Sequence, residues 1–462
     1  KNNSIQPVDE VLAVLFDLAK QHVKTSADPD DPVSIWIRGY LSDADSDNAV
    51  VSNSSYTDQP HPTALPLGLR RAQGTSLWYS GERSLITIAP PGSGKSQCHV
   101  IPTLMHYRGP VIVLDIKGEC YTATAEWRGK NIGPVFRFNP VEADTSARYN
   151  PLALLSDATD NLWEEARFMA DLLVVMKSTG DPTWETQGKE LLTLFLAYVV
   201  ALHEPEDRSI SMLLDLLATI GLQEMLGAVS AAGSPFPSAM RRTAARFSNM
   251  MANAPKQFEG VLSGVSQHMQ VWEGPKVERV TSGMDWHPED FRKAPYPTLY
   301  LCIPPNAIET YAPLLRVIIG QHIRRLTHQE PARSVPSLLL LLDELPRLGR
   351  MEPIREALEV GRSYRMKLWM FAQHMAQLEE AYPHLASGMV SSCGARIYMN
   401  PSLDTAEKIS KEFGKKKSLF SDKKEDRLEP LDIIGNRHRD SIFVLGLNEE
   451  PTILTKQFFF NQ

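Results

Sequence analysis

The stretch SLLLLLDELPRLG, Ser337–Gly349, runs five consecutive leucines into two adjacent carboxylates. An apolar run without polar alternation is typical of a strand buried on both faces, as in parallel sheets covered by helices. In open α/β sheets, ligands bind beyond the carboxyl ends of such strands. Asp343 and Glu344 are therefore placed where a functional site is expected.

Other apolar runs alternate with helical patterns along the chain. Strands are predicted at 84–88, 111–115, 134–138, 298–303, 367–371 and 395–399. Apolar residues at i, i+3 and i+4 predict helices at 160–176, 187–202, 210–226, 310–326 and 353–364. This alternation predicts an α/β fold with a doubly wound, mainly parallel sheet.

The change of pattern along the chain predicts its domain organisation. Residues 65–150 and 291–462 are expected to form one α/β domain, and 151–290 an all-α domain inserted into it. Residues 1–64 comprise an amphipathic helical pattern, VDEVLAVLFDLAKQHV, and an Asp-, Ser-, Asn- and Pro-rich stretch that is typical of a flexible linker.

The composition limits the classes of function. The chain has 462 residues, with 43% hydrophobic and 22% charged, which is typical of a soluble protein of two or three domains. A net charge of -7 gives no global attraction to nucleic acid, so such binding would need a local basic surface. The four cysteines lie far apart without CxxC spacing, which favours reduced thiols over a metal site or disulfides.

The longest apolar segment, LLTLFLAYVVAL at Leu191–Leu202, is shorter than the roughly 20 residues that a membrane-spanning helix needs. No signal peptide is visible, and the chain begins at Lys1. We therefore expect a piece of a longer protein, with any membrane anchor outside this chain.

A phosphate-binding motif follows the first predicted strand. APPGSGKS, Ala89–Ser96, matches G-x-x-x-x-G-K-[ST] except at the first position, where Ala89 is tolerated if its φ is negative. Backbone N–H groups of such a loop surround a phosphate, Lys95 reaches the β- and γ-phosphates, and the Ser96 hydroxyl ligates Mg²⁺. A chance Gly/Ser turn before a helix is the alternative. Pro102 predicts a kink or an early end of that helix. The predicted residues for binding ATP are Pro91, Gly92, Ser93, Gly94, Lys95, Ser96 and Gln97.

The motif gives the two carboxylates separate predicted roles. A phosphate-loop site takes a further Mg²⁺ contact from an aspartate at the end of a buried strand, which fits Asp343. Glu344 would then act as general base toward water. The alternative is a helix N-cap at Asp343 followed by a solvated glutamate.

Two more residues are candidates for the same site. Gln373 follows another buried strand, KLWMF, and its amide could orient water or sense the γ-phosphate; an ordinary polar cap is the alternative. Arg362 ends the helix predicted after Asp343 and could neutralise transition-state charge in a neighbouring subunit, although an arginine there also suits the helix dipole.

In these motifs and their order, the sequence resembles the type IV secretion coupling proteins, the TraG-like conjugative DNA-transfer ATPases. The resemblance rests on APPGSGKS, VIVLDIKGECYTATAEWR, RYNPL, the helical insertion, LLDELPRLG, GRSYRMKLWMFAQHMAQLEEAYPH and TAEKISKEFG. It covers roughly Leu65 to the C-terminus.

The resemblance implies an ATP-driven hexameric motor with a RecA-like P-loop NTPase core, at the cytoplasmic face of the bacterial inner membrane. Its expected partners are single-stranded DNA or a relaxase–DNA complex and the components of a type IV secretion channel. The family usually has membrane-spanning helices before the motor domain, so anchoring here would use a segment or partner outside this chain. The implied roles are Walker A for Lys95 and Ser96, Walker B for Asp343 and Glu344, third-motif glutamine for Gln373 and arginine finger for Arg362.

Two basic runs are candidates for contacting DNA: Arg241, Arg242 and Arg246 on the insertion, and Lys415–Lys417, Lys423 and Lys424 near the C-terminus. Neither has interleaved aromatic residues, and solvated surface charge is the alternative. Two rival functions stay open, an intracellular DNA pump of FtsK or HerA type and a substrate receptor whose nucleotide only stabilises assembly.

Overall fold

The computed structural model describes residues 55–58, 60–158, 160–174, 182–417, 424–446 and 450–459. The predicted N-terminal helix lies outside the described residues, as does Lys423. The described part from Tyr56 onward forms one compact unit.

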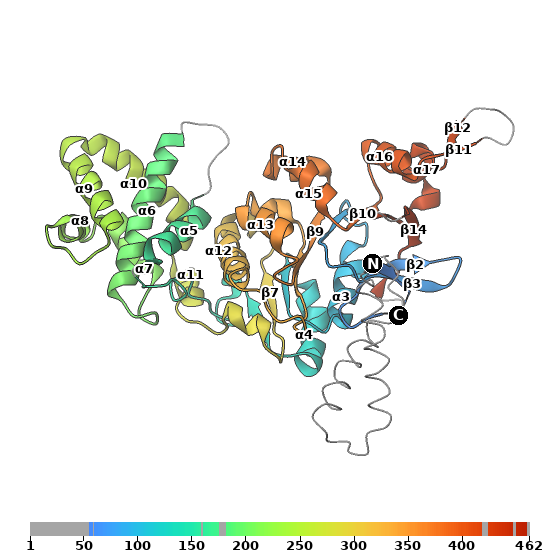
Figure 1. Cartoon of the computed structure of the whole chain (residues 1–462), viewed down its shortest axis with the longest axis horizontal. Coiled ribbons are helices and arrows are strands. Elements are labelled where there is room, and N and C mark those ends of the chain that lie inside the picture. The colour runs from blue at the N-terminus through green and yellow to red at the C-terminus, as the bar shows by residue number, and fades with distance from the viewer. Residues whose placement is uncertain are drawn as a thin grey trace, which may run out of the picture. The chain divides into compact units, whose positions relative to one another are not determined.

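A single large sheet runs through the α/β part of the described chain (Figure 1). Its parallel section has the strand order β10-β4-β9-β8-β5-β7-β6, so chain order and spatial order differ, as in doubly wound folds. The bounds are β4 Leu85–Ile88, β5 Val111–Asp115, β6 Val135–Phe138, β7 Thr298–Cys302, β8 Leu338–Leu342, β9 Met366–Ala372 and β10 Ala395–Met399. The predicted parallel strands are confirmed.

The leucine run forms β8, at the centre of the parallel section. All five of its leucines are fully buried. Leu338, Leu340 and Leu342 belong to one core cluster, while Leu339 and Leu341 belong to the other. Successive side chains of a strand point to opposite faces. Both faces of β8 are therefore covered, which explains the absence of polar alternation in its sequence.

Helices pack on both faces of this section. On one face lie α3 (Ile101–His106) and α4 (Glu119–Asn131), and on the other α12 (Ile308–Leu326) and α13 (Glu352–Val360). Further helices in the C-terminal part are α14 Met375–Ala381, α15 Ala386–Ser392, α16 Leu403–Phe413 and α17 Pro430–Ile434. The result is the three-layer arrangement that the alternating pattern predicts.

An antiparallel section extends the sheet beyond β10, in the order β1-β3-β2-β14-β13. Its strands are β1 Tyr56–Thr57, β2 Leu65–Arg70, β3 Thr75–Tyr79, β13 Ser441–Gly446 and β14 Thr452–Thr455. The apolar runs above predict none of these strands. They are short, and β14 pairs with β2 from the far end of the sequence, so their register depends on tertiary contacts. A separate hairpin joins β11 (Lys415–Lys417) and β12 (Lys424–Asp426).

Seven α-helices lie between β6 and β7 in the described chain, and Figure 1 shows them grouped together. They are α5 Leu162–Leu173, α6 Pro182–Leu202, α7 Ile210–Leu217, α8 Leu222–Ser230, α9 Ser238–Asn253, α10 Pro255–Met269 and α11 Pro275–Thr281. We call them the helical region. It meets the α/β part closely at α12, where a Cβ on Gly320 would lie 2.6 Å from Leu172. The boundaries proposed for an inserted domain stay a prediction.

The pattern at 210–226 predicts uninterrupted helix, and this is wrong between α7 and α8. Thr219 and Gly221 adopt left-handed backbone conformations, with φ of 64° and 67°, and the two helices are bent by 98°. Left-handed residues end an α-helix. In the described residues no single helix is long and apolar enough to cross a membrane; only the bent pair α7–α8 meets those criteria, when its helices are counted together.

Candidate nucleotide site

The phosphate loop leaves the carboxyl end of β4 beside the end of β9. The Ala89 N–H donates to the Ala372 carbonyl at 2.9 Å, which fixes the start of the loop next to Gln373. Ala89 is not among the described residues with positive φ, so the small side chain at this position is accommodated as expected. Gly92 and Gly94 do have positive φ, 75° and 92°, which non-glycine residues rarely adopt.

The helix after the loop begins irregularly, as Pro102 predicts. Ser96–Val100 forms a wide π-type turn that continues into the six residues of α3, with Pro102 in the first turn of α3. Proline has no N–H to donate and clashes with the carbonyl four residues earlier, so the preceding turn widens. The helix N-terminus still points its first N–H groups at the loop.

The loop lysine and the two carboxylates meet. Lys95 Nζ lies 3.5 Å from Asp343 Oδ1 and 3.7 Å from Glu344 Oε1. The three side chains are largely shielded from solvent, with exposed fractions of 10%, 18% and 18%. One ammonium therefore faces two adjacent carboxylates at the end of the central strand.

Gln373 completes this cluster. Its Nε2 donates to Glu344 Oε1 at 2.9 Å, and its backbone N–H donates to Gln377 Oε1 at 3.3 Å. Gln373 and Glu344 follow β9 and β8, which are parallel neighbours, so their ends share one edge of the sheet. Glu344 itself has a left-handed backbone, with φ of 57°, which is unusual for a residue with a side chain. Such strain commonly accompanies functional sites.

Burial changes the ionisation of Asp343. Loss of solvent raises the pKa of its carboxyl to about 6; Lys95 opposes this rise, while Glu344 and Asp115 add to it. Burial likewise raises the pKa of Asp115, which ends the neighbouring strand β5. Backbone N–H groups oppose that second shift, and the Tyr121 N–H donates to Asp115 Oδ2 at 2.7 Å. Buried carboxylates are costly unless a cation compensates them.

Several buried polar atoms at the loop lack partners within the described residues. They are Ser93 Oγ, Gln97 Oε1 and Asp343 Oδ1, of which the last accepts no hydrogen bond although Lys95 is near. Buried polar atoms are normally hydrogen-bonded. Unsatisfied acceptors and a hydroxyl around a glycine loop fit a phosphate and its cation. The residues present are therefore suited to hold a nucleotide with Mg²⁺, through the Ser96 hydroxyl and Asp343.

Arg362 lies outside this cluster. It comes after the last residue of α13, Val360, and its Nε donates to Glu82 Oε2 at 2.7 Å, with both side chains more than half exposed. Glu82 precedes β4 and Arg362 precedes β9, whereas the loop and Gln373 follow those strands. Arg362 thus lies at the amino edge of the parallel strands, opposite to the cluster, and within one chain it does not reach the site.

Four of the basic candidates, Arg241, Arg242, Arg246 and Lys415, are exposed. Arg241, Arg242 and Arg246 lie on the exposed face of α9, and Arg246 forms an ion pair with Glu190 of α6. Lys415 lies in β11 and pairs with Asp426 at 3.7 Å. Lys416, Lys417 and Lys424 belong to the same hairpin backbone.

Three residues at the site carry no prediction from the sequence. Arg347 Nε lies 2.8 Å from Glu344 Oε2, and its i, i+3 spacing from Glu344 is the signal that could have found it. Asp115 ends VIVLD as Asp343 ends LLLLLD, which is also a readable signal. Phe458 packs on the phosphate loop, where a Cβ on Gly94 would lie 2.8 Å from its ring. The sequence around Phe458 offers no comparable clue.

The sheet order, the glycine loop and the carboxylates after β8 define an α/β P-loop NTPase fold, and solved structures agree. The bacterial conjugative coupling protein TrwBdeltaN70, in its unbound monoclinic form, superposes with a TM-score of 0.61 at 15% identity, covering 82% of this chain and 88% of that one. The plasmid coupling protein TrwB has also been solved with ADP and Mg²⁺, and that structure gives a TM-score of 0.59 at 14% identity, covering 82% of this chain and 86% of that one. At these identities the likeness establishes the RecA-like fold alone.

The family follows from sequence comparison. The family described as type IV secretory system conjugative DNA transfer matches residues 44–425. The chain belongs to this family. It is 29% identical to the protein VirD4 of Rhizobium radiobacter over 350 residues, 73% of this chain and 50% of that protein. It is 29% identical to the conjugal transfer protein TraG of Escherichia coli over 357 residues, 72% of this chain and 55% of that protein. The chain spans about half the length of these relatives.

Proposed function

We propose that the chain is the ATP-hydrolysing part of a coupling protein, which recruits DNA or nucleoprotein and drives it toward a type IV secretion channel. The observation that carries this proposal is the meeting of Lys95, Asp343, Glu344 and Gln373 at one edge of the sheet. A receptor that only binds nucleotide has no need for a strained glutamate beside the phosphate loop. Family membership supplies the biological setting.

The mechanism uses the chain's own groups in order. Lys95 leaves the two carboxylates and moves to the β- and γ-phosphates of ATP, while the N–H groups of the loop hold the phosphate oxygens. When Mg²⁺ is bound, Ser96 and Asp343 would hold it, and it would offset the charge of the phosphates. Removal of Lys95 takes one cation away from Glu344, which acts as the base that accepts a proton from the attacking water. Gln373, already bonded to Glu344, orients that water.

Arg362 has a different role in this proposal. Because it lies at the opposite edge of the sheet, it can serve only a site in a neighbouring subunit. In a closed ring, an exposed guanidinium of one subunit would meet the γ-phosphate bound by the next and stabilise transition-state charge. A homo-hexamer is therefore part of the proposal, with residues 151–290 as an inserted domain.

The setting and partners are also proposed. The chain would act at the cytoplasmic face of the inner membrane, held there by a segment or partner outside residues 1–462. Its substrate would be single-stranded DNA or a relaxase–DNA complex, contacted by exposed basic residues such as Arg241 and Arg242. An intracellular pump acting on duplex DNA is the alternative motor, and a receptor without hydrolysis is the alternative class.

ATP hydrolysis separates these functions. The rate is measured alone, with single-stranded DNA and with duplex DNA, for the unmodified chain and for Glu344→Gln. We expect stimulation by single strands and loss of hydrolysis in the variant, with nucleotide binding retained. Stimulation by duplex alone would favour the pump, and no hydrolysis at high protein concentration would favour the receptor.

A further inference from the structure

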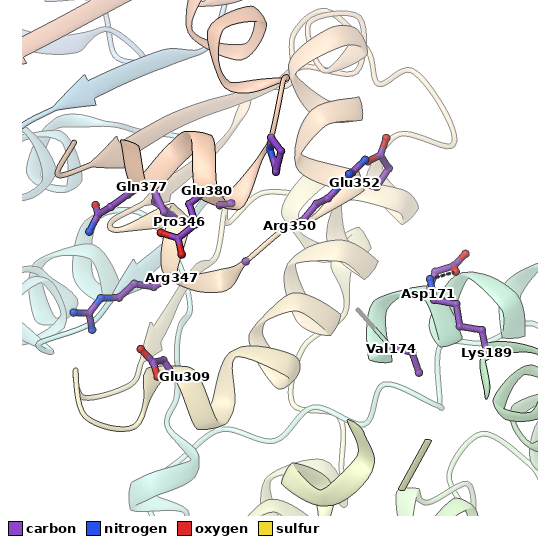
Figure 2. A pocket seen from close by; sticks show the side chains of 13 residues that line it. Asp171, Val174, Lys189, Glu309, Pro346, Arg347, Arg350, Glu352, Gln377 and Glu380 are labelled. Atoms are coloured by element: carbon purple, nitrogen blue, oxygen red, sulfur yellow. Dashed lines mark hydrogen bonds and ion pairs between the residues drawn. The ribbon is translucent and has the colours of Figure 1, made fainter. Parts of the chain in front are cut away.

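A cavity of about 990 Å³ opens next to the Walker B carboxylates (Figure 2). Asp171 and Lys189 of the helical region line one side, while Arg347 and Gln377 of the α/β part line the other. In Figure 2 the side chains of Arg347 and Gln377 extend to the same side, away from Asp171 and Lys189. One wall of the cavity is therefore made of residues that also contact the candidate site, Arg347 through Glu344 and Gln377 through Gln373.

Arg347 links this cavity to the proposed general base. Its Nε is 2.8 Å from Glu344 Oε2, and its Nη1 donates to the Pro305 carbonyl at 3.2 Å. About a third of the side chain, 36%, is exposed. Arg347 is thus anchored at two points yet borders open space into which it can turn.

Glu344 is surrounded by one hydrogen-bond donor and two cations in this arrangement. Oε1 accepts from Gln373 Nε2 at 2.9 Å and lies 3.7 Å from Lys95, while Oε2 faces Arg347. An ionised carboxylate offers about four acceptor positions. With one donor and two cations around it, few of these positions stay open to a water molecule. ATP would remove Lys95 but would leave the guanidinium of Arg347 in place.

Two further carboxylates line the same cavity as the Arg347 guanidinium. Glu309 and Glu380 line it, and among the described residues neither forms an ion pair. Figure 2 shows both on the same side of the cavity as Arg347. The two other cations of the lining are already engaged, Lys189 with Asp171 at 2.9 Å and Arg350 with Glu352 at 3.4 Å. Arg347 is therefore the cation that contacts Glu344 and also shares the cavity lining with two carboxylates that have no ion pair of their own among the described residues.

We propose that Arg347 is a positioning residue that holds Glu344 in a resting orientation and restrains hydrolysis until it turns toward the cavity. The cavity has walls from both the helical region and the α/β part, so a substrate that shifts the helical region would change the space available to Arg347. This inference rests on the proposed ATPase function. It makes Arg347 a restraint on the reaction and not one of its catalytic groups.

The test compares Arg347→Gln with Arg350→Gln, a matched change on the same cavity that leaves Glu344 untouched. Steady-state ATP hydrolysis is measured with and without single-stranded DNA, together with KM and the affinity for a fluorescent ATP analogue. Arg347→Gln should raise kcat without DNA by about twofold to fivefold, the effect of removing one partly exposed ion pair, with KM nearly unchanged. Its stimulation by DNA should shrink in proportion. Arg347→Lys should restore part of the restraint, and Arg350→Gln should behave like the unmodified chain.

A double variant, Glu344→Gln with Arg347→Gln, should hydrolyse no ATP, because the gain acts through Glu344. A damaged fold would lower kcat, so a rise cannot come from misfolding. If the unmodified chain hydrolyses ATP and Arg347→Gln leaves kcat unchanged or lowers it, the restraint is wrong while the proposed function stands. If the unmodified chain hydrolyses no ATP but Arg347→Gln does, the proposed restraint is supported. If neither the unmodified chain nor Arg347→Gln hydrolyses ATP, the restraint and the proposed ATPase function are both wrong.

Discussion

The two edges of the parallel sheet hold charged residues in opposite ways. At the carboxyl edge, Lys95, Asp343 and Glu344 are largely buried and share partners with one another and with Gln373. At the amino edge, Arg362 and Glu82 form a single ion pair with more than half of each side chain exposed. Arg362 belongs to the predicted site together with the residues of the carboxyl edge, yet only the latter meet within a single chain.

The difference is one of energy as well as position. Buried charges are costly, so a cluster such as that around Asp343 persists only if its members compensate each other and serve a ligand. An exposed ion pair contributes about 0–1 kcal/mol and is easily exchanged for another partner. The carboxyl edge is therefore arranged to act inside one chain, and the amino edge is free to act on another.

The largest expected effect concerns the cation of the carboxyl edge. Lys95→Ala removes the group that meets the phosphates, leaves Asp343 without its cation and leaves Glu344 with Arg347 alone. We expect ATP hydrolysis to fall by about 10³-fold. Hydrolysis and binding of a fluorescent nucleotide are measured together, with thermal unfolding as the control for folding. Retention of near-normal hydrolysis would remove the phosphate loop from the mechanism.

The next effect tests whether the amino edge acts in another subunit. Arg362→Ala should lower hydrolysis by about 10²-fold, because it removes one charge that stabilises the transition state. Glu82→Ala breaks the same ion pair but keeps Arg362, so its activity should stay normal.

Mixing the two kinds of damaged subunit sharpens this test. A subunit with Arg362→Ala keeps its own loop and Glu344, while one with Glu344→Gln keeps Arg362. Equal mixing should restore part of the hydrolysis, since some interfaces then carry both intact groups. If Arg362→Ala hydrolyses ATP at the rate of the unmodified chain, the ion pair between Arg362 and Glu82 is only a surface contact.

A smaller effect is expected for the amide at the carboxyl edge. Gln373→Ala removes the donor to Glu344 Oε1, and kcat should fall by about tenfold, as for loss of one positioning hydrogen bond. KM should change little, because Gln373 touches neither the loop glycines nor Lys95 in the structure described. Gln377→Ala, which removes only the acceptor for the Gln373 backbone, is the matched control. Equal losses in both variants would mean that local structure, and not the amide, is responsible.

The smallest effect is a pH dependence of Mg²⁺-nucleotide binding. The pKa of Asp343 is raised to about 6, so the carboxyl is ionised at about pH 7.5 and mostly protonated at about pH 5.5. Protonation removes the charge proposed to hold Mg²⁺. Affinity for Mg²⁺-ADP should therefore fall about fourfold as pH drops across this range. Calorimetry measures this affinity, with Mg²⁺-free ADP as the reference. Asp343→Asn should bind Mg²⁺-ADP weakly at both pH values. If the variant shows the same pH dependence as the unmodified chain, a group other than Asp343 is the one that titrates.

Periodicity and motif spacing predicted much of this architecture. The parallel strands appear as continuous apolar runs because both of their faces are buried, so β8 and β9 could be located without a structure. The carboxyl-end rule then placed Asp343, Glu344 and Gln373 together, which the contacts bear out.

Other features could not be read in this way. The antiparallel strands β2 and β14 pair across most of the chain, and no local pattern specifies such a partner. The break between α7 and α8 depends on left-handed residues that interrupt an otherwise helical spacing. Phe458 reaches the phosphate loop only because β14 carries it there.

The sequence by itself determined the class of protein and which polar groups lie at the ends of the strands, because APPGSGKS and LLLLLDE are local patterns whose meaning follows from backbone geometry and burial. Only the tertiary structure decided which charges meet. It brought Arg347 against Glu344 and put Arg362 at the opposite edge, although both arginines follow β8 in the same short stretch of chain. Contacts depend on how strands and helices pack, and sequence distance does not encode that.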